Sequence, residues 1–171
     1  MKRLALLATV ALAIGAFVVT SGTGAQPPNV PHSITLTFTE RDSEGTFNFI
    51  DVRPLTRFTR EGPRRVSPGD GFAITQPLHD TGGARAAKLY VICHAVNGSR
   101  RFSRVRFLCQ GEVTLKDGTL SITALFRDVG PGAVTGEVVG GSGGYEGANG
   151  SFTSTGGENP TDTFHIVTFS S

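Results

Sequence analysis

Short runs in which apolar and polar residues alternate fill most of this sequence, and this two-residue period most constrains the fold. In "HSITLTFTE" (His32–Glu40), Ile34, Leu36 and Phe38 alternate with serine and threonine. Successive side chains of a strand point to opposite faces, so such a run predicts a β-strand with one buried face. Similar runs, rich in β-branched and aromatic residues, follow at residues 47–52, 71–75, 88–93, 104–115, 120–126, 133–139, 150–155 and 162–169. We predict eight or nine short antiparallel strands in an all-β domain, which is either a sandwich or a closed barrel.

The first 25 residues have the pattern of a secretory signal peptide. The basic pair Lys2–Arg3 precedes an apolar run of about 16 residues, and small residues follow up to Ala25. A retained membrane anchor is the alternative, since the run is only slightly short for a bilayer span. We predict a signal peptide at 1–25, a polar leader at 26–31 and one domain at 32–171, in a secreted, extracellular protein.

The charge of the predicted domain gives no support for binding to nucleic acid or to a membrane. Removing Lys2 and Arg3 from the 16 basic residues leaves 14, which equals the number of acidic residues. A neutral domain has no net electrostatic attraction for a polyanion. The basic cluster "SRRFSRVR" (Ser99–Arg106) fits a solvated strand edge. We expect no nucleic-acid partner, and no membrane contact once the signal peptide is removed.

Cys93 and Cys109 are the two cysteines of the chain. An even number of cysteines in an exported protein favours a disulfide, which at this spacing would stabilise the fold by ~3 kcal/mol. Two cysteines at this spacing form no recognisable zinc motif, and we expect no metal site. Strand alternation places both on apolar faces, provided that the loop between their strands is wide. A tight hairpin turn at Asn97-Gly98 would keep them apart.

The glycine-rich segment "GGSGGYEGANG" (Gly140–Gly150) is not a phosphate-binding loop. It lacks the glycine spacing of a dinucleotide loop and the lysine of a P-loop. Either loop must also open a helix, whereas the next residues, "SFTST", are typical of a strand. The segment therefore predicts a tight connection between two strands at the rim of the sheet, with Tyr145 as its single large side chain.

The longer stretch "AVTGEVVGGSGGYEGANGSFTST" resembles the glycine signature of the allene oxide cyclase barrel family, to which dirigent proteins are related. "TERDSEGTF" (Thr39–Phe47) is similar to the first hairpin of that family. "SPGDGFAITQPLHDTGGARAAKLYVIC" is similar to its Gly-Asp strand, the turn after it and the following strand. The resemblance covers most of Ile34–Phe169. It implies a single eight-stranded antiparallel β-barrel, often trimeric, with a small apolar cavity.

The resemblance also suggests where site residues lie. The catalytic glutamate of the plant cyclases falls on Thr37 and its paired asparagine on Thr39, and a threonine cannot supply a carboxylate charge. Cys93 falls where the cyclases also have a cavity-side cysteine. We expect the ligand cavity to be lined by Thr37, Thr39, Asp51 and Cys93. The catalytic candidates are Asp51, Thr37 and Thr39, with Asp51 included because an acid on an apolar strand face can donate a proton.

The first strand has two conceivable inward faces. Hydrophobicity points Ile34, Leu36 and Phe38 into the core. The resemblance instead points the threonines between them inward. We favour the register that the family implies, in which the apolar residues lie outside and are buried in a homotrimer.

Three functions fit such a barrel, because a fold alone does not determine a function. An exported cyclase or isomerase would fold a small hydrophobic molecule into a reactive conformer. A binding module would carry or sequester such a molecule, and a structural or interaction barrel would be filled by its own side chains. We expect an exported barrel that holds a small hydrophobic molecule. If it is an enzyme, we expect an isomerase or cyclase without a cofactor.

Overall fold

The alternating segments form one antiparallel sheet in the computed structural model, which describes residues 30–52, 58–59, 62–63, 65–127, 132–157 and 160–170. The signal peptide predicted at 1–25 lies outside the described residues. The strands of this sheet are β1 (Val30–Glu40), β2 (Thr46–Ile50), β5 (Gly71–His79), β6 (Arg85–Ala95), β7 (Arg106–Leu115), β8 (Gly118–Arg127), β9 (Val134–Gly143), β10 (Asn149–Thr155) and β11 (Thr161–Ser170). A separate short hairpin consists of β3 (Phe58–Thr59) and β4 (Gly62–Pro63). The short 3-10 helices η1 (Asp42–Glu44) and η2 (Phe102–Arg104) lie in connections.

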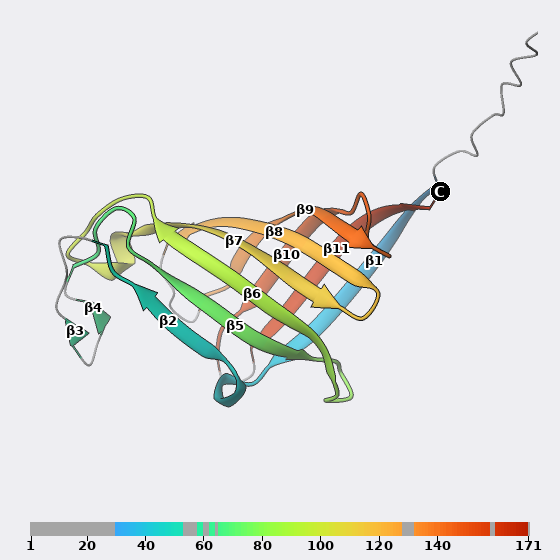
Figure 1. Cartoon of the computed structure of the whole chain (residues 1–171), viewed down its shortest axis with the longest axis horizontal. Helices are drawn as coiled ribbons and strands as arrows, with labels where there is room; N and C mark the ends of the chain where they lie inside the picture. Colours follow the sequence, from blue (N-terminus) through green and yellow to red (C-terminus); the bar gives the residue numbers. More distant parts are fainter. Residues whose placement is uncertain are drawn as a thin grey trace, which may run out of the picture.

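The sheet closes on itself into a barrel (Figure 1). Its strand order is β1-β11-β10-β9-β8-β7-β6-β5-β2, and β1 pairs with β5 as well as with β11. This closing contact places Thr39 opposite His79 and Glu40 opposite Leu78. The predicted eight-stranded antiparallel barrel is therefore confirmed, and β2 is a ninth strand that pairs with β5 beyond the closure.

The first and last strands of the barrel lie side by side (Figure 1). Their antiparallel ladder runs from the pair Val30–Ser170 to the pair Thr39–Thr161. The remaining barrel strands are joined in chain order, each to the next, so this ladder and the short β1–β5 contact complete the ring.

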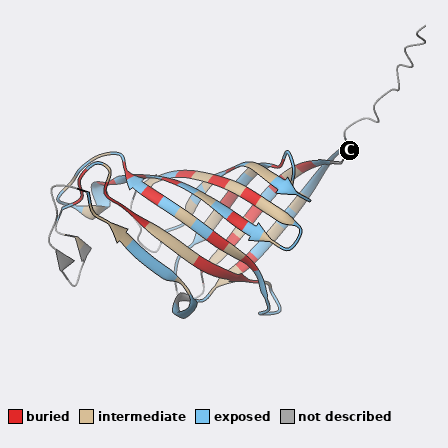
Figure 2. Ribbon diagram, viewed as in Figure 1, coloured by how far each residue is buried: buried red, intermediate tan, exposed pale blue. Residues whose placement is uncertain are grey.

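The core occupies the inside of the barrel and follows the pleat of the strands. Figure 2 shows buried and exposed residues alternating along several strands. Full burial of a large apolar side chain stabilises the folded state by about 1.5–3 kcal/mol, which makes this face the main source of stability. The largest fully buried apolar side chains are Phe107, Phe164, Leu78, Leu120, Ile166, Val66, Val105 and Val113.

The register favoured above for the first strand is wrong. Phe38 is buried, and Leu36 and Ile34 pack against the core, whereas Thr35 and Thr37 are exposed. The ring of Phe38 meets that of Phe164 edge to face, with 6.0 Å between centroids. Burial of the apolar face thus determines which side of β1 points inward, and the apolar stripe expected on the outside does not exist.

The predicted disulfide is confirmed. Cys93 and Cys109 are directly opposite each other on β6 and β7, with their Cα atoms 4.0 Å apart. The loop between these strands is wide, as this pairing requires. The Asn97 side chain holds it together by donating to the Arg104 carbonyl (3.0 Å) and accepting from the Arg106 N–H (2.7 Å).

The glycine-rich segment is partly strand and partly turn. β9 continues to Gly143, and the turn then leads into β10 at Asn149. Gly143 has a φ of +62°, a conformation that favours glycine. The Gly144 N–H donates to the Asp117 carbonyl oxygen at 2.7 Å, which ties this turn to the β7–β8 turn. The predicted tight connection between two strands is confirmed.

Gly141 and Gly140 provide a test of why glycine is needed in β9. A Cβ at Gly141 would lie 2.7 Å from the Thr119 carbonyl oxygen and closer still to that of Tyr145, whereas a Cβ at Gly140 meets nothing within 4 Å. Gly141→Ala should lower the free energy of unfolding by about 1–3 kcal/mol, because the overlap displaces backbone. Gly140→Ala should change it by less than about 0.5 kcal/mol. Urea denaturation of both variants measures the difference, and equal stabilities would contradict the argument.

Candidate ligand cavity

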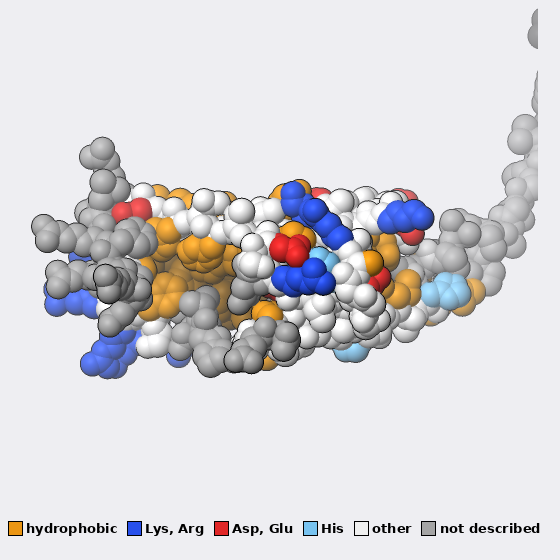
Figure 3. Space-filling view, turned by 90° about the horizontal axis from the view of Figure 1, so that it is seen from below, with side chains coloured by type: hydrophobic (Ala, Val, Ile, Leu, Met, Phe, Trp, Pro, Cys, Tyr) orange, Lys and Arg blue, Asp and Glu red, His pale blue; other side chains and the backbone are white. Residues whose placement is uncertain are grey.

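The described side chains leave a cavity in the barrel interior. A cavity of about 480 Å³ lies where the connections from β8 to β9 and from β10 to β11 meet. Figure 3 shows hydrophobic side chains gathered in a hollow on one face of the molecule. Small-molecule sites in proteins commonly enclose about 300–1,000 Å³, so the cavity has the size of a ligand site.

Two groups of phenylalanines border this space. In the first, Phe107 packs against Phe72 and Phe126, with ring centroids 5.2 and 6.0 Å apart. In the second, Phe164 packs against Phe38 and Phe152, at 6.0 and 5.7 Å. Phe72, Phe126 and Phe152 line the cavity itself. The exposed ring of Phe47, from the extra strand β2, stacks on Phe72 at 5.2 Å.

Small side chains leave the room between these aromatic groups. Cys93, Cys109 and Ala124 line the cavity from neighbouring strands β6, β7 and β8. Each occupies an inward position where a larger side chain would reduce the volume. The disulfide is therefore part of the cavity wall as well as a cross-link.

Two carboxyl groups lie at one side of the cavity. Glu40, at the end of β1, is half-buried and is the only ionisable side chain among the described residues that line the cavity. Asp162, on β11, is 2% exposed. Asp162 lies opposite Phe38 on one neighbouring strand and opposite Ser154 on the other, and Ser154 also lines the cavity. The Glu40 N–H donates to the Pro160 carbonyl at 2.9 Å, which fixes the end of β1 against β11.

Burial raises the pKa of the Asp162 carboxyl above its ordinary value of 3.8. Hydrogen bonds with Glu40 and Ser154 act in the opposite direction but do not cancel this effect. One oxygen of Asp162, Oδ2, is buried without a hydrogen-bond partner among the described residues. The interior thus holds a pair of acids in contact, one of which retains its proton to a higher pH than an exposed aspartate.

The structure brings only some of the predicted site residues to the cavity. Cys93 lines it. Thr37 is on the outer face of β1, and neither Thr39 nor Asp51 is among the lining residues. The positions of Thr37 and Thr39 outside the cavity follow from the register of β1, which is the opposite of the one favoured from the sequence. Asp51 follows the end of β2, the strand outside the closed ring.

Glu40 and Asp162 were missed by the sequence analysis, although a signal for both exists. Glu40 is two residues after Phe38, and Asp162 is two residues before Phe164. The side chain of each acid therefore lies on the same face of its strand as apolar residues that point inward. A carboxylate on a buried strand face lowers the stability of the folded state unless it has a hydrogen-bond partner, and such a residue is often retained for a function.

The described residues contain no group of histidine, cysteine, aspartate or glutamate side chains that could hold a metal ion. Within the same residues, no helix is long and apolar enough to cross a bilayer.

The protein is a closed antiparallel barrel with a mostly apolar interior cavity. Solved structures with a similar fold are known. No protein-family model matches the sequence, and no curated protein matches it. The solved structure of a pyocyanin demethylase is similar to this chain with a TM-score of 0.62 and 15% identity, over 78% of this chain and 99% of the other.

Two further solved structures share the fold. The pterocarpan synthase dirigent protein GePTS1 has a TM-score of 0.56 and 13% identity, over 83% of this chain and 93% of the other. The exo-specific intermolecular Diels–Alderase AbnU has a TM-score of 0.55 and 14% identity, over 81% of this chain and 99% of the other. These similarities show that the barrel fold is shared with these proteins. The specific resemblance to allene oxide cyclases stays a prediction.

The raised pKa of Asp162 leads to a prediction about stability and pH. The folded state binds the proton of Asp162 more tightly than the unfolded state, so this group makes the wild type less stable as pH rises from about 3.8 through the raised pKa. Asp162→Asn removes that ionisation. The free energy of unfolding of the variant, relative to wild type, should therefore increase between about pH 4 and pH 7.

Urea denaturation at several pH values measures this difference. Asp117→Asn is the control, because it makes the same substitution at an exposed position in the β7–β8 turn. A constant difference between Asp162→Asn and wild type at all pH values would contradict the prediction.

Proposed function

We propose that this protein is an exported barrel that binds a small hydrophobic molecule in its cavity and holds it in a conformation that cyclises or isomerises. The observation that carries the proposal is the apolar cavity of about 480 Å³ with one carboxylate, Glu40, at its wall. A shaped apolar site accelerates a unimolecular reaction by restricting its substrate to a reactive conformer.

Glu40 supports the catalytic part of the proposal. The resemblance to plant cyclases places their glutamate on Thr37, which has no charge and lies outside the barrel. Glu40 brings a carboxylate into the interior from a position three residues further along the same strand. A carboxylate held beside an apolar cavity can stabilise positive charge that develops in a substrate.

A barrel filled by its own side chains is the alternative that the cavity argues against. Non-catalytic binding of a small hydrophobic molecule remains the second candidate, because most lining residues are apolar. Proteins named as a demethylase, a dirigent protein and a Diels–Alderase share this fold, which supports a small-molecule ligand without choosing between the two candidates.

Filling the cavity tests the proposal. Ala124→Phe should place a ring in the cavity, whereas Ala86→Phe adds the same ring at an exposed position on β6. After incubation with a lipid and metabolite extract, native mass spectrometry should find a small molecule retained by wild type and by Ala86→Phe but not by Ala124→Phe. Circular dichroism checks that both variants fold. The absence of any retained molecule, or equal retention by all three proteins, would contradict binding in the cavity.

The same retained molecule separates catalysis from binding. If the protein is catalytic, incubation should convert the molecule into an isomer of equal mass that chromatography resolves, and Glu40→Gln should slow the conversion. Recovery of the unchanged molecule would instead favour the binding module.

The proposal includes export, which rests on the sequence pattern of residues 1–25 and is compatible with the Cys93–Cys109 disulfide. Intact-mass measurement on protein from the culture medium should give a chain that begins at Gln26. A mass that still includes residues 1–25 would contradict it.

The proposal also includes a homotrimer, now supported by a different surface. On the outer face of β6, β7 and β8, Ile92, Leu108 and Leu125 are exposed, and Leu108 is directly opposite Leu125. Burial of such apolar residues between chains would favour association. Light scattering should give the mass of three chains at micromolar concentration, and the mass of one chain would contradict this.

A further inference from the structure

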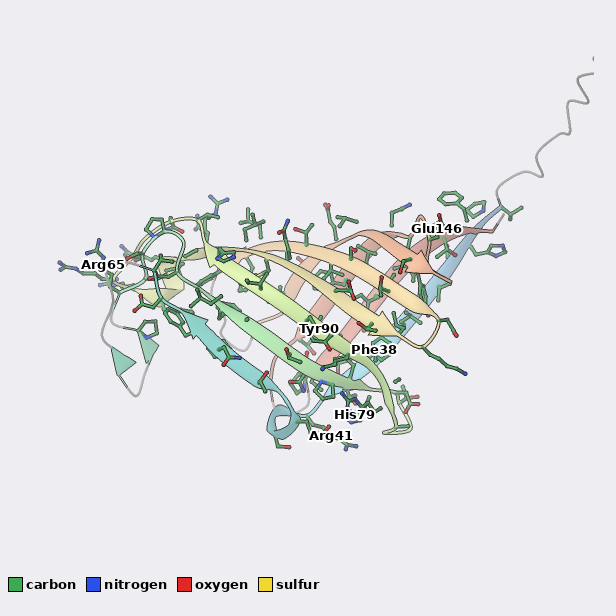
Figure 4. The ribbon with its side chains drawn as sticks, in the orientation of Figure 1. Phe38, Arg41, Arg65, His79, Tyr90 and Glu146 are labelled. Carbon is green, nitrogen blue, oxygen red and sulfur yellow. A yellow bond between two sulfur atoms is a disulfide. The ribbon has the colours of Figure 1, made fainter. Side chains whose placement is uncertain are left out.

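Basic side chains gather at one end of the barrel, although the predicted domain has no net charge. Figure 4 shows Arg65 at this end, opposite the end that carries Glu146. The expectation of no membrane contact rests on the net charge alone, and a neutral protein can still present a strongly charged surface. The exposed arginines of this end, which come from three separate stretches of the chain, are Arg65, Arg100, Arg101, Arg104, Arg106 and Arg127.

Backbone pairing brings these stretches together. Val66 forms an antiparallel bridge with Ser99, with both hydrogen bonds at 2.9 Å, and this places Arg65 beside the connection from β6 to β7. Arg106 and Arg127 are directly opposite each other on β7 and β8. The basic cluster therefore lies in a connection and at the ends of two strands that are paired on both sides, and not at the solvated strand edge that the sequence suggests.

No ion pair within the part of the chain that the structure describes involves these arginines. The ion pairs found there join Glu44 to Arg41 and to His79. The carboxylate of Asp70, which is close to Arg65 in the chain, is buried and accepts hydrogen bonds from two backbone N–H groups at 2.9 and 2.7 Å. Like charges directly opposite each other on neighbouring strands lower the stability of the sheet. An external anion bound at this end would offset that repulsion.

Exposed apolar side chains lie among the arginines. Val96 is 49% exposed, and its N–H donates to the Arg106 carbonyl oxygen at 2.9 Å. Val52 is 39% exposed and lies against Gly69, whose N–H donates to the Ala95 carbonyl oxygen at 2.9 Å. A surface that combines basic and apolar side chains matches the interface of a bilayer, where the apolar groups enter the headgroup region. A nucleic acid offers the phosphate charge without an apolar layer behind it.

The cavity lies at the same end of the barrel. Phe126 lines the cavity, and the next residue, Arg127, is exposed. Figure 3 shows basic side chains at the end of the molecule beside the hydrophobic hollow. We propose that this arginine-rich end binds the surface of a bilayer that contains anionic lipids, with the cavity on the side that faces the bilayer. The lipid phosphates supply the negative charge that the arginines do not find among the described residues.

Sedimentation with lipid vesicles tests the proposal. The protein used is the chain from Gln26 onward, because the apolar run within residues 1–25 would itself enter a bilayer. In about 0.1 M salt, it should bind mixed vesicles of phosphatidylglycerol and phosphatidylcholine at least about tenfold more tightly than vesicles of phosphatidylcholine alone. Raising the salt to about 1 M should remove most of this preference, because salt screens exposed charges.

Two double variants locate the binding surface. Arg106→Gln with Arg127→Gln should weaken binding to the mixed vesicles by roughly 25-fold, since each basic side chain near an anionic surface strengthens binding by about fivefold. Arg85→Gln with Lys116→Gln is the matched control, because it removes the same charge from exposed positions at the opposite end of β6 and β7. The control should bind nearly as tightly as wild type.

Circular dichroism checks that both double variants fold. If Arg106→Gln with Arg127→Gln does not fold, Arg100→Gln with Arg101→Gln takes its place, because these two residues lie in the connection between strands. Val96→Ser should also weaken binding to the mixed vesicles, and it should leave any binding to a DNA duplex unchanged.

The outcomes separate this proposal from the proposed function. Equal binding to the two kinds of vesicle, or equal losses in the two double variants, would overturn it and leave binding of a small molecule in the cavity standing. Tighter binding to a DNA duplex than to the mixed vesicles in the same buffer would also overturn it, because the phosphate partner would then be a nucleic acid.

Discussion

Two residue pairs at the end of β1 close this barrel, and much of the interior depends on them. Thr39 and Glu40 pair with His79 and Leu78 of β5, and then the chain leaves the ring through η1. The inward phase of β1 at this point places Glu40 at the cavity wall. Because the contact is so short, β2 takes over the pairing with β5 outside the ring and brings Phe47 against Phe72.

Local alternation predicts the strands, and the even number of cysteines in a chain with an export signal predicts the disulfide. The eight-stranded barrel was predicted from the resemblance to a known family, because alternation alone is equally compatible with a sandwich. The prediction of which face of β1 points inward is wrong, because the alignment to a family was given more weight than the burial of Ile34, Leu36 and Phe38. That error also hid the acid pair. With the correct phase, Glu40 and Asp162 both point inward, but their contact depends on the pairing of β1 with β11. Such pairing joins residues far apart in the chain, and no local pattern specifies it.

The cavity exists because part of its wall, beside Phe72 and Phe126, is made of small groups. A directly opposed cysteine pair, with Cα atoms 4.0 Å apart, is a thin and rigid piece of that wall. Ala124 continues the same surface on β8. The result is a site whose shape is fixed by covalent and backbone geometry, and this pre-organisation reduces the entropy that a ligand loses when it binds.

The ladder between β1 and β11 also determines the order in which the molecule can fold. The hairpins from β5 to β11 join neighbours in the chain and can form as each strand becomes available. β1 must wait for a partner about 130 residues away, from Thr35 to His165, and such distant contacts slow folding. Until then the edges of β1 and β11 remain unpaired, and both are open to association with other chains. The completion of the barrel and the removal of its most aggregation-prone edges are therefore the same event.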